Sequence, residues 1–507
     1  MSESATGGAG LFWTGHAIVD VGIAGLCAFS KVDRPESLSL AHLDAVADFL
    51  EATYYGKKEL LGTYLSCVFM NASFVQPSEG ADKRTAFIAG YLRAHRAPSD
   101  PRVAGTRCVF SGLPATSPLV RTHLPLFSGE GVLNFRPDGQ TSVPVAGPFV
   151  VAIMFVPLAG RRTEGRMLLV HADDSGLTLE FARRYLDDNR RLLSLALPSE
   201  RQDVYPEFER EQPMWDATKK RNKFADAKAP RSLVLSDLTT IAARSAGTYS
   251  DPTPTALTIY LISNSGQGPS LEIVALPSGV VSFVQKAATR DATRDAWQAV
   301  TSAFRPAQQT ESEGPAAAKR KKRPPIPGRP GWSRNPAFEE LCEVYASGYI
   351  DRTAAGKWLR RNLLGRLEWK DSTQYVATRA RSWALTDLFL TEVLAMKAPR
   401  IEAVRSFADK LADHISRTKD RKLYRSLVFD RLHEVRSALL SAQRRTAAES
   451  RVLFGLDEYA SVWLHEDGDE FLVRDLITIR VVERLGEAGY FRSNPDDAIE
   501  AEAAPAD

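Results

Sequence analysis

The stretch FVVAIMFVPLAGRRTEGRMLLVH occupies residues 149–171 and contains two apolar runs on either side of a polar turn. Residues 149–157 and 166–171 are rich in Val, Ile, Leu and Phe, and the turn at 161–165 ends in glycine. Apolar runs that flank a short glycine-containing turn are typical of a β-hairpin. We therefore expect antiparallel strands in this part of the chain.

A second pair of apolar runs supports the same expectation. Residues 257–262 and 271–276 flank the sequence NSGQGP at 264–269, which carries a strong turn signal. Residues 232–235 indicate a further strand. The pattern from about 178 to 197 predicts a helix.

Helices are also expected before the first hairpin. Thr14 is a candidate N-cap for a helix that extends to Phe29 and contains Asp20. A second helix is predicted behind Ser37 or Ser39, where apolar residues recur at three- and four-residue spacing: Leu40, Leu43, Val46, Ala47, Leu50 and Tyr54. The apolar run 60–69 fits either a strand or a buried helix.

The composition changes at residues 310–335, where Pro, Gly and Ala dominate and a run of lysines and arginines precedes three prolines. Such a segment cannot bury a core, and we expect an exposed linker. Beyond it, apolar residues form three helical stripes that predict a bundle of antiparallel helices: Ile401, Val404, Ala408, Leu411 and Ile415; Val428, Leu432, Val435 and Leu439; Leu472, Leu476 and Ile479.

These patterns predict an α+β protein with five regions. They are an N-terminal α/β region at 1–140, a strand-rich middle region with antiparallel hairpins at 141–309, the basic Pro-rich linker at 310–335, an all-α C-terminal helical bundle at 336–493 and an acidic disordered tail at 494–507.

Composition excludes several classes of protein. Of the 507 residues, 44% are hydrophobic and 25% are charged, which is ordinary for a globular protein and unlike a disordered or membrane-embedded chain. The formal net charge is only +3, so any nucleic-acid binding must come from local patches. No signal peptide or membrane span is evident, and we expect a cytoplasmic protein without a membrane partner.

The sequence contains no catalytic motif. The histidines form no metal-binding spacing, and no Walker A, GxGxxG or GxSxG motif occurs. The best catalytic string is His171 with Asp173 and Asp174, but it closes a hydrophobic run where a polar turn is expected in any case. We predict no catalytic residue, no cofactor and no enzyme activity.

Two groups of basic residues are candidates for nucleic-acid contact. Neutralising phosphates releases counterions, which favours clustered lysines and arginines. The first group is the linker run Lys319, Arg320, Lys321, Lys322 and Arg323. The second is Arg417, Arg421 and Arg425, whose four-residue spacing predicts one helical face, widened by Lys419, Lys422, Arg444 and Arg445. A solvent-exposed linker and an ordinary bundle surface are the alternatives.

Tryptophans accompany arginines in the first part of the bundle, and some could stack on bases. Burial in the core is the more common role of such tryptophans. The residues concerned are Trp332, Trp358, Trp369 and Trp383.

Three segments, in their order along the chain, resemble a known family. FWTGHAIVDVGI at 12–23 is similar to a TGNPFVDAGI-type opening, with His16 and Ala17 replacing Asn and Pro. CVFSG at 108–112, followed by residues 124–135, lies where the family carries CxxCG and LP…NF. ISNSGQGP at 262–269, with ALP at 275–277, is similar to its SNxGQGP…LP hairpin. The chain thus resembles the CXXC-CXXC family of CRISPR-associated proteins, which also includes myxobacterial fruiting body developmental protein T.

The chain departs from this family at its cysteines. Ser111 stands where the second thiol of a CxxC would be, and Cys27, Cys67, Cys108 and Cys342 are far apart in sequence. Tetrahedral zinc needs thiolate or imidazole ligands. We therefore predict no metal, with Cys108 as a remaining thiol in a region held by packing.

The resemblance implies the large subunit of a type I Cascade-like effector. Such a subunit binds near the 5′ handle of the CRISPR RNA, helps recognise the target-adjacent motif and stabilises the R-loop for a recruited helicase-nuclease. Its implied partners are CRISPR RNA, target DNA, and the backbone and small Cascade subunits. Guide pairing supplies the sequence specificity in such systems.

Two other hypotheses remain open. One is a nucleic-acid-linked developmental regulator, acting in fruiting body formation or sporulation on the same scaffold. The other is an enzyme that uses His171 and Asp173. We also expect the turn at 264–269 to contact RNA or a neighbouring subunit through Asn264 and Gln267, with a plain hairpin turn as the alternative.

Overall fold

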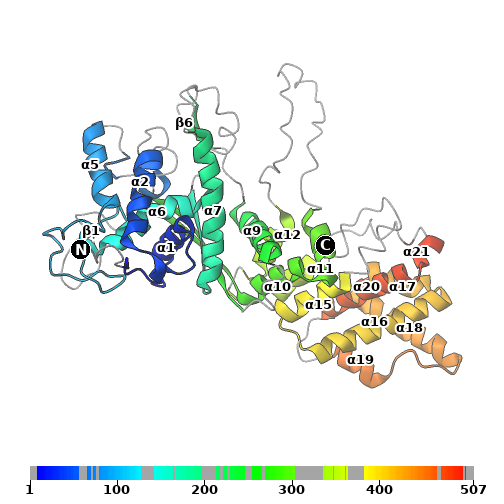
Figure 1. Cartoon of the computed structure of the whole chain (residues 1–507). Coiled ribbons are helices and arrows are strands. Elements are labelled where there is room, and N and C mark those ends of the chain that lie inside the picture. The colour runs from blue at the N-terminus through cyan, green and yellow to red at the C-terminus, as the bar shows by residue number, and fades with distance from the viewer. Residues whose placement is uncertain are drawn as a thin grey trace, which may run out of the picture. The chain divides into compact units, whose positions relative to one another are not determined.

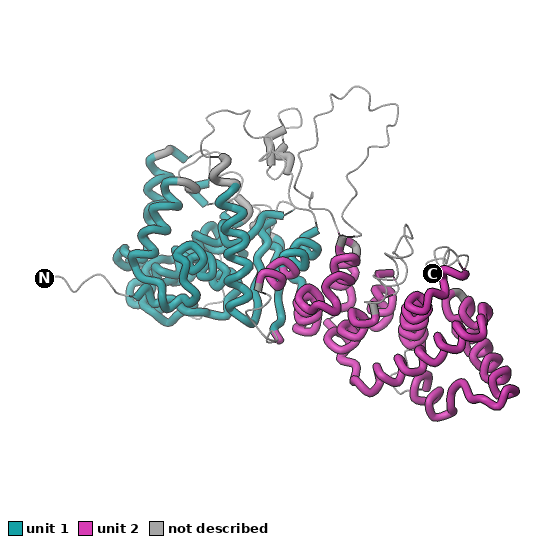
Figure 2. The backbone as a smooth tube through the Cα atoms, turned by 45° about the vertical axis from the view of Figure 1, so that its right-hand side comes forward, with its two compact units in different colours: residues 1–237, 255–275 teal, residues 238–254, 276–507 magenta. Residues whose placement is uncertain are grey.

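The computed structural model shows the α+β class that the sequence predicts. The chain divides into two compact units: an N-terminal unit of residues 1–237 and 255–275, and a C-terminal unit of 238–254 and 276–507 (Figure 1, Figure 2). The residues that the structure describes are 8–55, 66–69, 72–75, 79–126, 142–163, 166–196, 213–216, 221–224, 229–245, 254–264, 269–302, 335–345, 348–359, 361–362, 382–464, 470–494 and 497.

The N-terminal unit combines helices with short strands. Its helical elements are α1 (Ala17–Ser30), the 3-10 helix η1 (Pro35–Ser37), α2 (Leu40–Phe49), the π-helix η2 (Leu50–Tyr55), α4 (Ser66–Phe69), α5 (Ala81–Leu92), α6 (Gly147–Ala159) and α7 (Ser175–Ala196). Its strands are β1 (Ser117–Leu119), β2 (Val143–Val145), β3 (Arg161–Thr163), β4 (Arg166–Ala172), β5 (Pro213–Asp216), β6 (Arg221–Phe224), β7 (Leu257–Asn264) and β8 (Pro269–Leu276). Helix α9 (Pro230–Ser245) continues from this unit into the C-terminal one.

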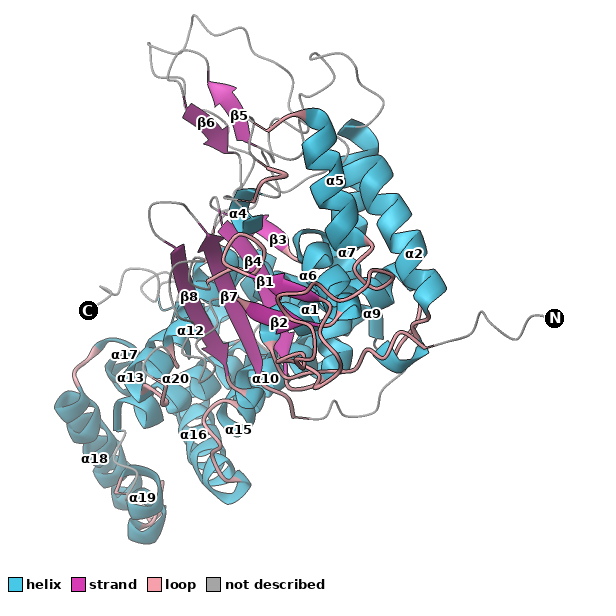
Figure 3. Ribbon diagram, turned by 90° about the vertical axis from the view of Figure 1, so that its left-hand side faces the viewer, coloured by secondary structure: helices cyan, strands magenta, loops and turns pink. Residues whose placement is uncertain are grey.

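The main sheet has four strands in the order β3-β4-β7-β8 (Figure 3). Strand β4 pairs antiparallel with β3 and with β7, and its register places Leu169 opposite Tyr260 and His171 opposite Thr258. Successive side chains of a strand alternate between the two faces, so Met167, Leu169 and His171 share one face. Met167 and Leu169 belong to the core that includes α1 and α6, which places His171 at the edge of that core.

Helix α1 packs against α6 at two glycines. A Cβ atom on Gly22 would lie 2.2 Å from the carbonyl oxygen of Ala152, and one on Gly25 would lie 2.5 Å from Cδ1 of Phe155. Both distances are shorter than any Cβ contact can be, so only glycine permits this approach of the helices. As a result, every residue of α1 from 18 to 27 is buried, including Asp20.

The strand predicted at 149–157 is wrong, because these residues lie in α6. The hairpin of this region consists instead of β3 and β4. Every residue of α6 from 149 to 159 is buried, so the helix has no polar face. A short helix that is buried all round lacks the 3.6-residue periodicity and cannot be distinguished from a buried strand by pattern alone.

The other predicted elements of the N-terminal unit have mixed outcomes. Strands β7 and β8 and helix α7 are confirmed. The strand predicted at 232–235 is wrong, because this run lies in helix α9. Of the ambiguous run 60–69, the structure describes 66–69, which form α4.

The two N-terminal helices are confirmed, but their caps differ. Ser39 caps α2, and its hydroxyl accepts a hydrogen bond from the backbone N–H of His42 at 3.3 Å. Helix α1 has His16 as its N-cap instead of the predicted Thr14. The Thr14 hydroxyl accepts a hydrogen bond from the backbone N–H of His16 at 3.1 Å, so it still contributes to the start of the helix.

In the C-terminal unit, the residues that the structure describes after β8 are entirely helical apart from their connections. The helices are α10 (Ser278–Thr289), α11 (Asp291–Ser302), α12 (Pro336–Glu343), α13 (Arg352–Leu359), α15 (Ser382–Glu392), α16 (Ala398–Thr418), α17 (Arg421–Phe429), α18 (Leu432–Ala448), α19 (Leu456–Trp463), α20 (Glu470–Glu487) and α21 (Tyr490–Ser493).

The helical stripes predicted for this unit are confirmed on α16 and α20, where their apolar residues are buried. The middle stripe is divided, because Val428 lies on α17 whereas Leu432, Val435 and Leu439 lie on α18. Helices α16 and α20 pack against each other and form the centre of the bundle.

The boundaries of the compact units differ from those of the expected regions. The expected middle region, 141–309, contributes the main sheet to the N-terminal unit, and α10 and α11 to the C-terminal unit. The expected linker lies outside the described residues except for Asn335, which caps α12. No helix in the described part of the chain has the length and apolar character needed to cross a membrane.

The contact between α1 and α6 makes a testable prediction. Gly22→Ala should lower the free energy of unfolding by about 1–3 kcal/mol, because the added methyl group overlaps the Ala152 carbonyl. Gly90→Ala in α5 is a matched control, since a Cβ there meets nothing within 4 Å and alanine is the better helix former. Urea unfolding of the full chain measures both. Equal stabilities of the two variants would contradict the close contact.

Candidate nucleic-acid interface and the Asp20 cluster

Asp20 is the centre of a polar cluster at the start of α1. Only 3% of this residue is exposed. Its Oδ1 accepts hydrogen bonds from the backbone N–H and the hydroxyl of Thr14, at 2.8 and 2.7 Å. Its Oδ2 accepts one from the backbone N–H of Gly15 at 2.9 Å and lies 3.3 Å from Nε2 of His171. The carboxylate therefore joins the chain segment before α1 to strand β4.

The ionisation of this cluster follows from its contacts. Burial by itself raises the pKa of Asp20, but hydrogen bonds from His171, Thr14 and Gly15 outweigh it, and the pKa lies below its usual value. Burial lowers the pKa of His16, although the charge of Asp20 opposes the effect. Asp20 is thus a buried, ionised structural anchor.

The cysteine-containing segment meets this cluster. The rings of His16 and Phe110 are in edge contact, with 5.1 Å between their centroids. The backbone N–H of Val109 donates to the carbonyl of Pro144 in β2 at 3.1 Å. Two of the three segments that carry the family resemblance, 12–23 and 108–112, therefore lie in contact with each other.

The segment 108–112 is closed by its own hydrogen bonds. The backbone N–H of Cys108 donates to the carbonyl of Leu113 at 2.7 Å, and that of Gly112 donates to the carbonyl of Cys108 at 2.9 Å. The Ser111 hydroxyl accepts from the backbone N–H of Leu113 at 3.3 Å, and Cys108 is 3% exposed. Within the described ranges, no group of three or more His, Cys, Asp or Glu could hold a metal ion.

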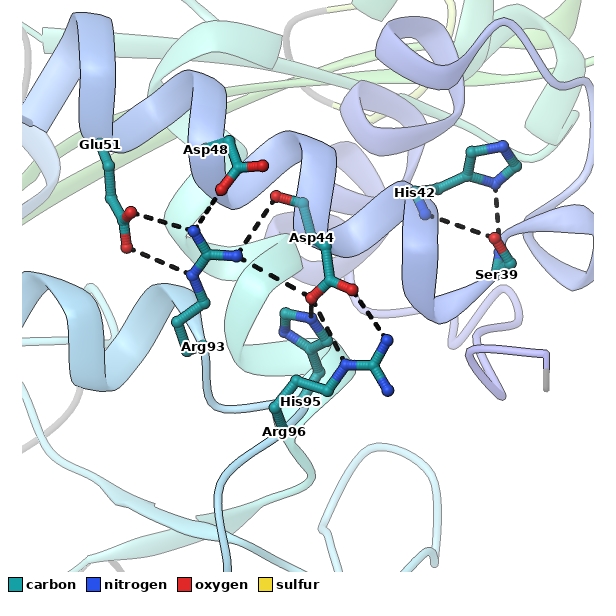
Figure 4. Close-up of polar contacts among 8 residues, drawn as sticks. All are labelled: Ser39, His42, Asp44, Asp48, Glu51, Arg93, His95 and Arg96. Carbon is teal, nitrogen blue, oxygen red and sulfur yellow. Dashed lines mark hydrogen bonds and ion pairs between the residues drawn. The ribbon is translucent and has the colours of Figure 1, made fainter. Parts of the chain in front are cut away.

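A network of ion pairs holds the end of α5 against α2 and η2 (Figure 4). Arg93 pairs with Glu51 at 3.0 Å and also with Asp48. Asp44 lies 2.8 Å from Nε2 of His95 and 2.8 Å from Nη2 of Arg96. Hydrogen bonds from Arg96 and, to a smaller extent, from His95 outweigh the effect of burial and together lower the pKa of Asp44 to about 2. The network fixes the point from which the chain leads to the cysteine-containing segment.

The catalytic candidates do not converge. His171 lies beside Asp20 and not beside Asp173, whose backbone N–H donates to the carbonyl of Ala256 at 3.1 Å. Asp174 accepts a hydrogen bond from the backbone N–H of Gly176 at 2.9 Å, at the start of α7. These contacts fit the polar turn that the sequence suggests here as the alternative to a catalytic site.

The single helical face predicted for Arg417, Arg421 and Arg425 is wrong. Helix α16 ends at Thr418, and Lys419 follows in the left-handed conformation, with φ 54°. Asp420 then caps α17, accepting a hydrogen bond from the backbone N–H of Leu423 at 3.1 Å. Arg417 therefore lies on one helix and the other two arginines on the next.

Arg421 is held by the C-terminal segment of the chain. Its Nε and Nη2 donate to the carboxylate of Asp497 at 3.0 and 2.6 Å. Asp497 has no exposed surface, and it also accepts hydrogen bonds from the hydroxyls of Tyr490, at 3.0 Å, and Tyr424, at 3.2 Å. The Arg421 side chain is 47% exposed, but its removal would leave the buried Asp497 carboxylate without its cation, so Arg421 contributes to the folded bundle.

The turn between α16 and α17 nevertheless carries a basic surface. The guanidinium of Arg445 on α18 contacts Asp420, which brings the end of α18 to this turn. Four cations here are exposed and form no ion pair with any residue that the structure describes. We call them the basic corner: Arg417, Lys419, Lys422 and Arg444.

The remaining candidate residues lie elsewhere or outside the described chain. The linker cations Lys319, Arg320, Lys321, Lys322 and Arg323 are outside the described residues, as are Gln267, Trp332 and Trp369. Asn264 is the last residue of β7. The base-stacking role considered for Trp358 and Trp383 is wrong, because both are buried.

Comparison of the chain with models of protein families, with curated proteins and with solved structures finds no match. The case for a function therefore rests on the residues described above.

Several residues of these sites were not predicted from the sequence. Asp20 was placed in its helix without a partner, and Asp497 was assigned to a disordered tail. One signal in the sequence could have identified the ion-pair network. Acidic residues at spacings of four and three lie on one helical face, as Asp44, Asp48 and Glu51 do.

The Asp20 cluster predicts a pH-dependent loss of stability. A carboxylate whose pKa is depressed by folding stabilises the fold above its unfolded pKa, and this contribution is lost as the pH falls through the folded pKa. Asp20→Asn should lower the free energy of unfolding at pH 7 by about 1–3 kcal/mol, because an amide cannot accept all of the hydrogen bonds. The difference from wild type should shrink in acid.

Urea unfolding between pH 7 and acid pH measures this effect. Asp33→Asn is the matched control, since the side chain of Asp33 is 86% exposed in its ion pair with Arg183. A loss at pH 7 no larger than that of the control would contradict the anchoring role of Asp20.

Proposed function

We propose that this protein is the large subunit of a type I CRISPR RNA-guided surveillance complex. In this role it binds near the 5′ handle of the CRISPR RNA, helps recognise the target-adjacent motif and stabilises the R-loop. Its partners are CRISPR RNA, target DNA, the backbone and small Cascade subunits and a recruited helicase-nuclease. It acts in the cytoplasm in antiviral defence.

The observation that carries the proposal is the meeting of two motif segments that are far apart in sequence. The N-terminal opening supplies Thr14, Gly15, His16 and Asp20, and the segment 108–112 contacts it through Phe110. The third motif segment connects β7 to β8 in the sheet that contains His171. The contact between the first two segments, each weak by itself, gives them a common structural reason to occur together.

The basic corner supports the DNA-binding part of the proposal. Arg417, Lys419, Lys422 and Arg444 are exposed in a chain whose net charge is only +3, so the positive charge is concentrated locally. Exposed cations without acidic partners can neutralise phosphates without first breaking an ion pair. We assign this surface to the backbone of the target DNA. The linker run 319–323 is proposed as a second contact.

We assign no catalytic role to the chain, and cleavage belongs to the recruited helicase-nuclease. The turn after β7 is proposed to contact RNA or a neighbouring subunit through Asn264 and Gln267. Asn264 ends β7 at the opposite end of the strand from Thr258, the residue that pairs with His171, so this contact would be separate from the Asp20 cluster.

Recovery of bound RNA tests the proposal. Full-length protein purified from its native cells should carry a discrete RNA of guide length with a constant 5′ sequence. The double variant Asn264→Ala, Gln267→Ala should recover less of this RNA. Recovery equal to wild type would show that residues 264–269 only reverse the chain and do not contact RNA. Absence of RNA, or a mixture of unrelated lengths, would contradict the effector role and favour the developmental regulator.

A further inference from the structure

Strand β8 is an open edge of the main sheet. The sheet ends at β3 on one side and at β8 on the other (Figure 3), and no strand that the structure describes pairs with the outer edge of either. The outer N–H and C=O groups of an edge strand have no ladder partners, so such an edge is a template for pairing with another strand.

The two edges differ in how they are protected. Proteins protect exposed edges with short strands and with charged side chains. Strand β3 has three residues, and two of them are arginines, Arg161 and Arg162. Strand β8 has eight residues, and its one charged side chain, Glu272, forms an ion pair with Arg166 of β4 at 2.7 Å. This charge is compensated within the sheet, so β8 lacks the usual protection.

An apolar row is exposed along β8. Leu271 is 45% exposed and Ile273 is 55% exposed, and Ala275 is exposed as well. Side chains two residues apart share one face of a strand, so these three form a single row. Prolines stand four residues from Ile273 on either side: Pro269, the first residue of β8, and Pro277, directly after the strand. Because proline has no N–H to donate, the segment that can pair lies between them.

We propose that β8 pairs antiparallel with β8 of a second copy of this chain, about a two-fold axis at Ile273. In this register Ile273 faces the partner's Ile273, and Leu271 faces the partner's Ala275, so the two apolar rows become continuous. Pro269 faces the partner's Pro277, so neither proline interrupts the pairing. The two four-stranded sheets then join into one.

The sequence of β8 favours this register over its neighbours. A two-fold antiparallel pairing is centred on a residue, because facing side chains lie on the same side of the sheet. Centring on Glu272 would place two carboxylates opposite each other, which is destabilising. Centring on Val274 would place Leu271 opposite the partner's Pro277, outside the strand. Centring on Ile273 avoids both, so the edge is complementary to itself and a second copy fits it.

The pairing should be weak and reversible. A contact through one strand of each copy is smaller than a standard interface of roughly 1,600 Å². We therefore expect monomer and dimer in equilibrium, with the dimer favoured at high protein concentration. The inference goes beyond the proposed function and does not rest on it, since neither RNA nor DNA enters its test.

Disulfide trapping of the full chain tests the register. Facing residues of an antiparallel pair have Cβ atoms about 4.5–5.5 Å apart, which a disulfide bridges after a small shift. In oxidised glutathione, Ile273→Cys should form at least about fivefold more linked dimer than Leu271→Cys, because position 271 faces 275 and not itself. A mixture of Leu271→Cys and Ala275→Cys, one of them carrying a size tag, should form the mixed dimer. The wild-type chain gives the background from its own cysteines.

Sedimentation equilibrium tests the dimer itself. Ile273→Lys places two lysines opposite each other and should weaken self-association by about tenfold or more. Leu456→Lys is the matched control, since Leu456 is 80% exposed on α19. This control should self-associate like wild type.

Three results would overturn the inference. The first is a wild-type chain that stays monomeric at every concentration. The second is equal trapping of Ile273→Cys and Leu271→Cys, because the proposed register would then be absent. The third is equal weakening by Ile273→Lys and Leu456→Lys, because the contact would then not be specific to β8.

Discussion

The close approach of α1 and α6 at Gly22 is the constraint on which the N-terminal unit depends. The position of Gly22 against the Ala152 carbonyl leaves no room for a side chain. Helix α1 is buried from residue 18 to residue 27, so a polar residue in this range lies in the core. Asp20, two residues before Gly22, is the polar residue that results, and the donors of Thr14, Gly15 and His171 satisfy its charge.

The two units use buried carboxylates in similar ways. Asp20 holds the segment before α1 against the sheet, and Asp497 holds the segment after α21 against α17. In both cases local donors compensate for the burial of charge, as they must in a low-dielectric environment. Arg421 is held by Asp497, whereas the four cations of the basic corner form no ion pair with any residue that the structure describes. Arg421 therefore stabilises the fold, whereas Arg417, four residues before it, is exposed and belongs to the basic corner.

The sequence predicted the elements that have a clear amphipathic period. The stripe on α16 and the strands β7 and β8 are examples, because α16 has one buried and one exposed side and a strong turn separates the two apolar runs of the hairpin. It failed for α6, where burial on every side removes the period. It also failed at Lys419 and Asp420, which end one helix and cap the next, although an aspartate three residues before Leu423 is a recognisable cap signal.

The candidate sites were less predictable than the fold because they depend on long-range contacts. Local spacing cannot reveal that Asp20 meets His171, 151 residues away, or that Arg421 meets Asp497, 76 residues away. The motif segments were nevertheless identified from the sequence, since each is a short local pattern. Their meeting in space is a property of the packing of α1, α6 and the sheet.

The salt dependence of DNA binding tests the central claim most directly. Replacing Arg417, Lys419, Lys422 and Arg444 by alanine should flatten the slope of log affinity against log salt by up to about 3.6 units, if all four contact duplex phosphates. A control variant removes four exposed cations elsewhere, at Lys83, Arg102, Arg294 and Arg361. The account predicts a flattened slope for the first variant and a slope close to wild type for the control. An unchanged slope in the first variant, or equal flattening in both, would contradict the assignment of the basic corner as the DNA-binding surface.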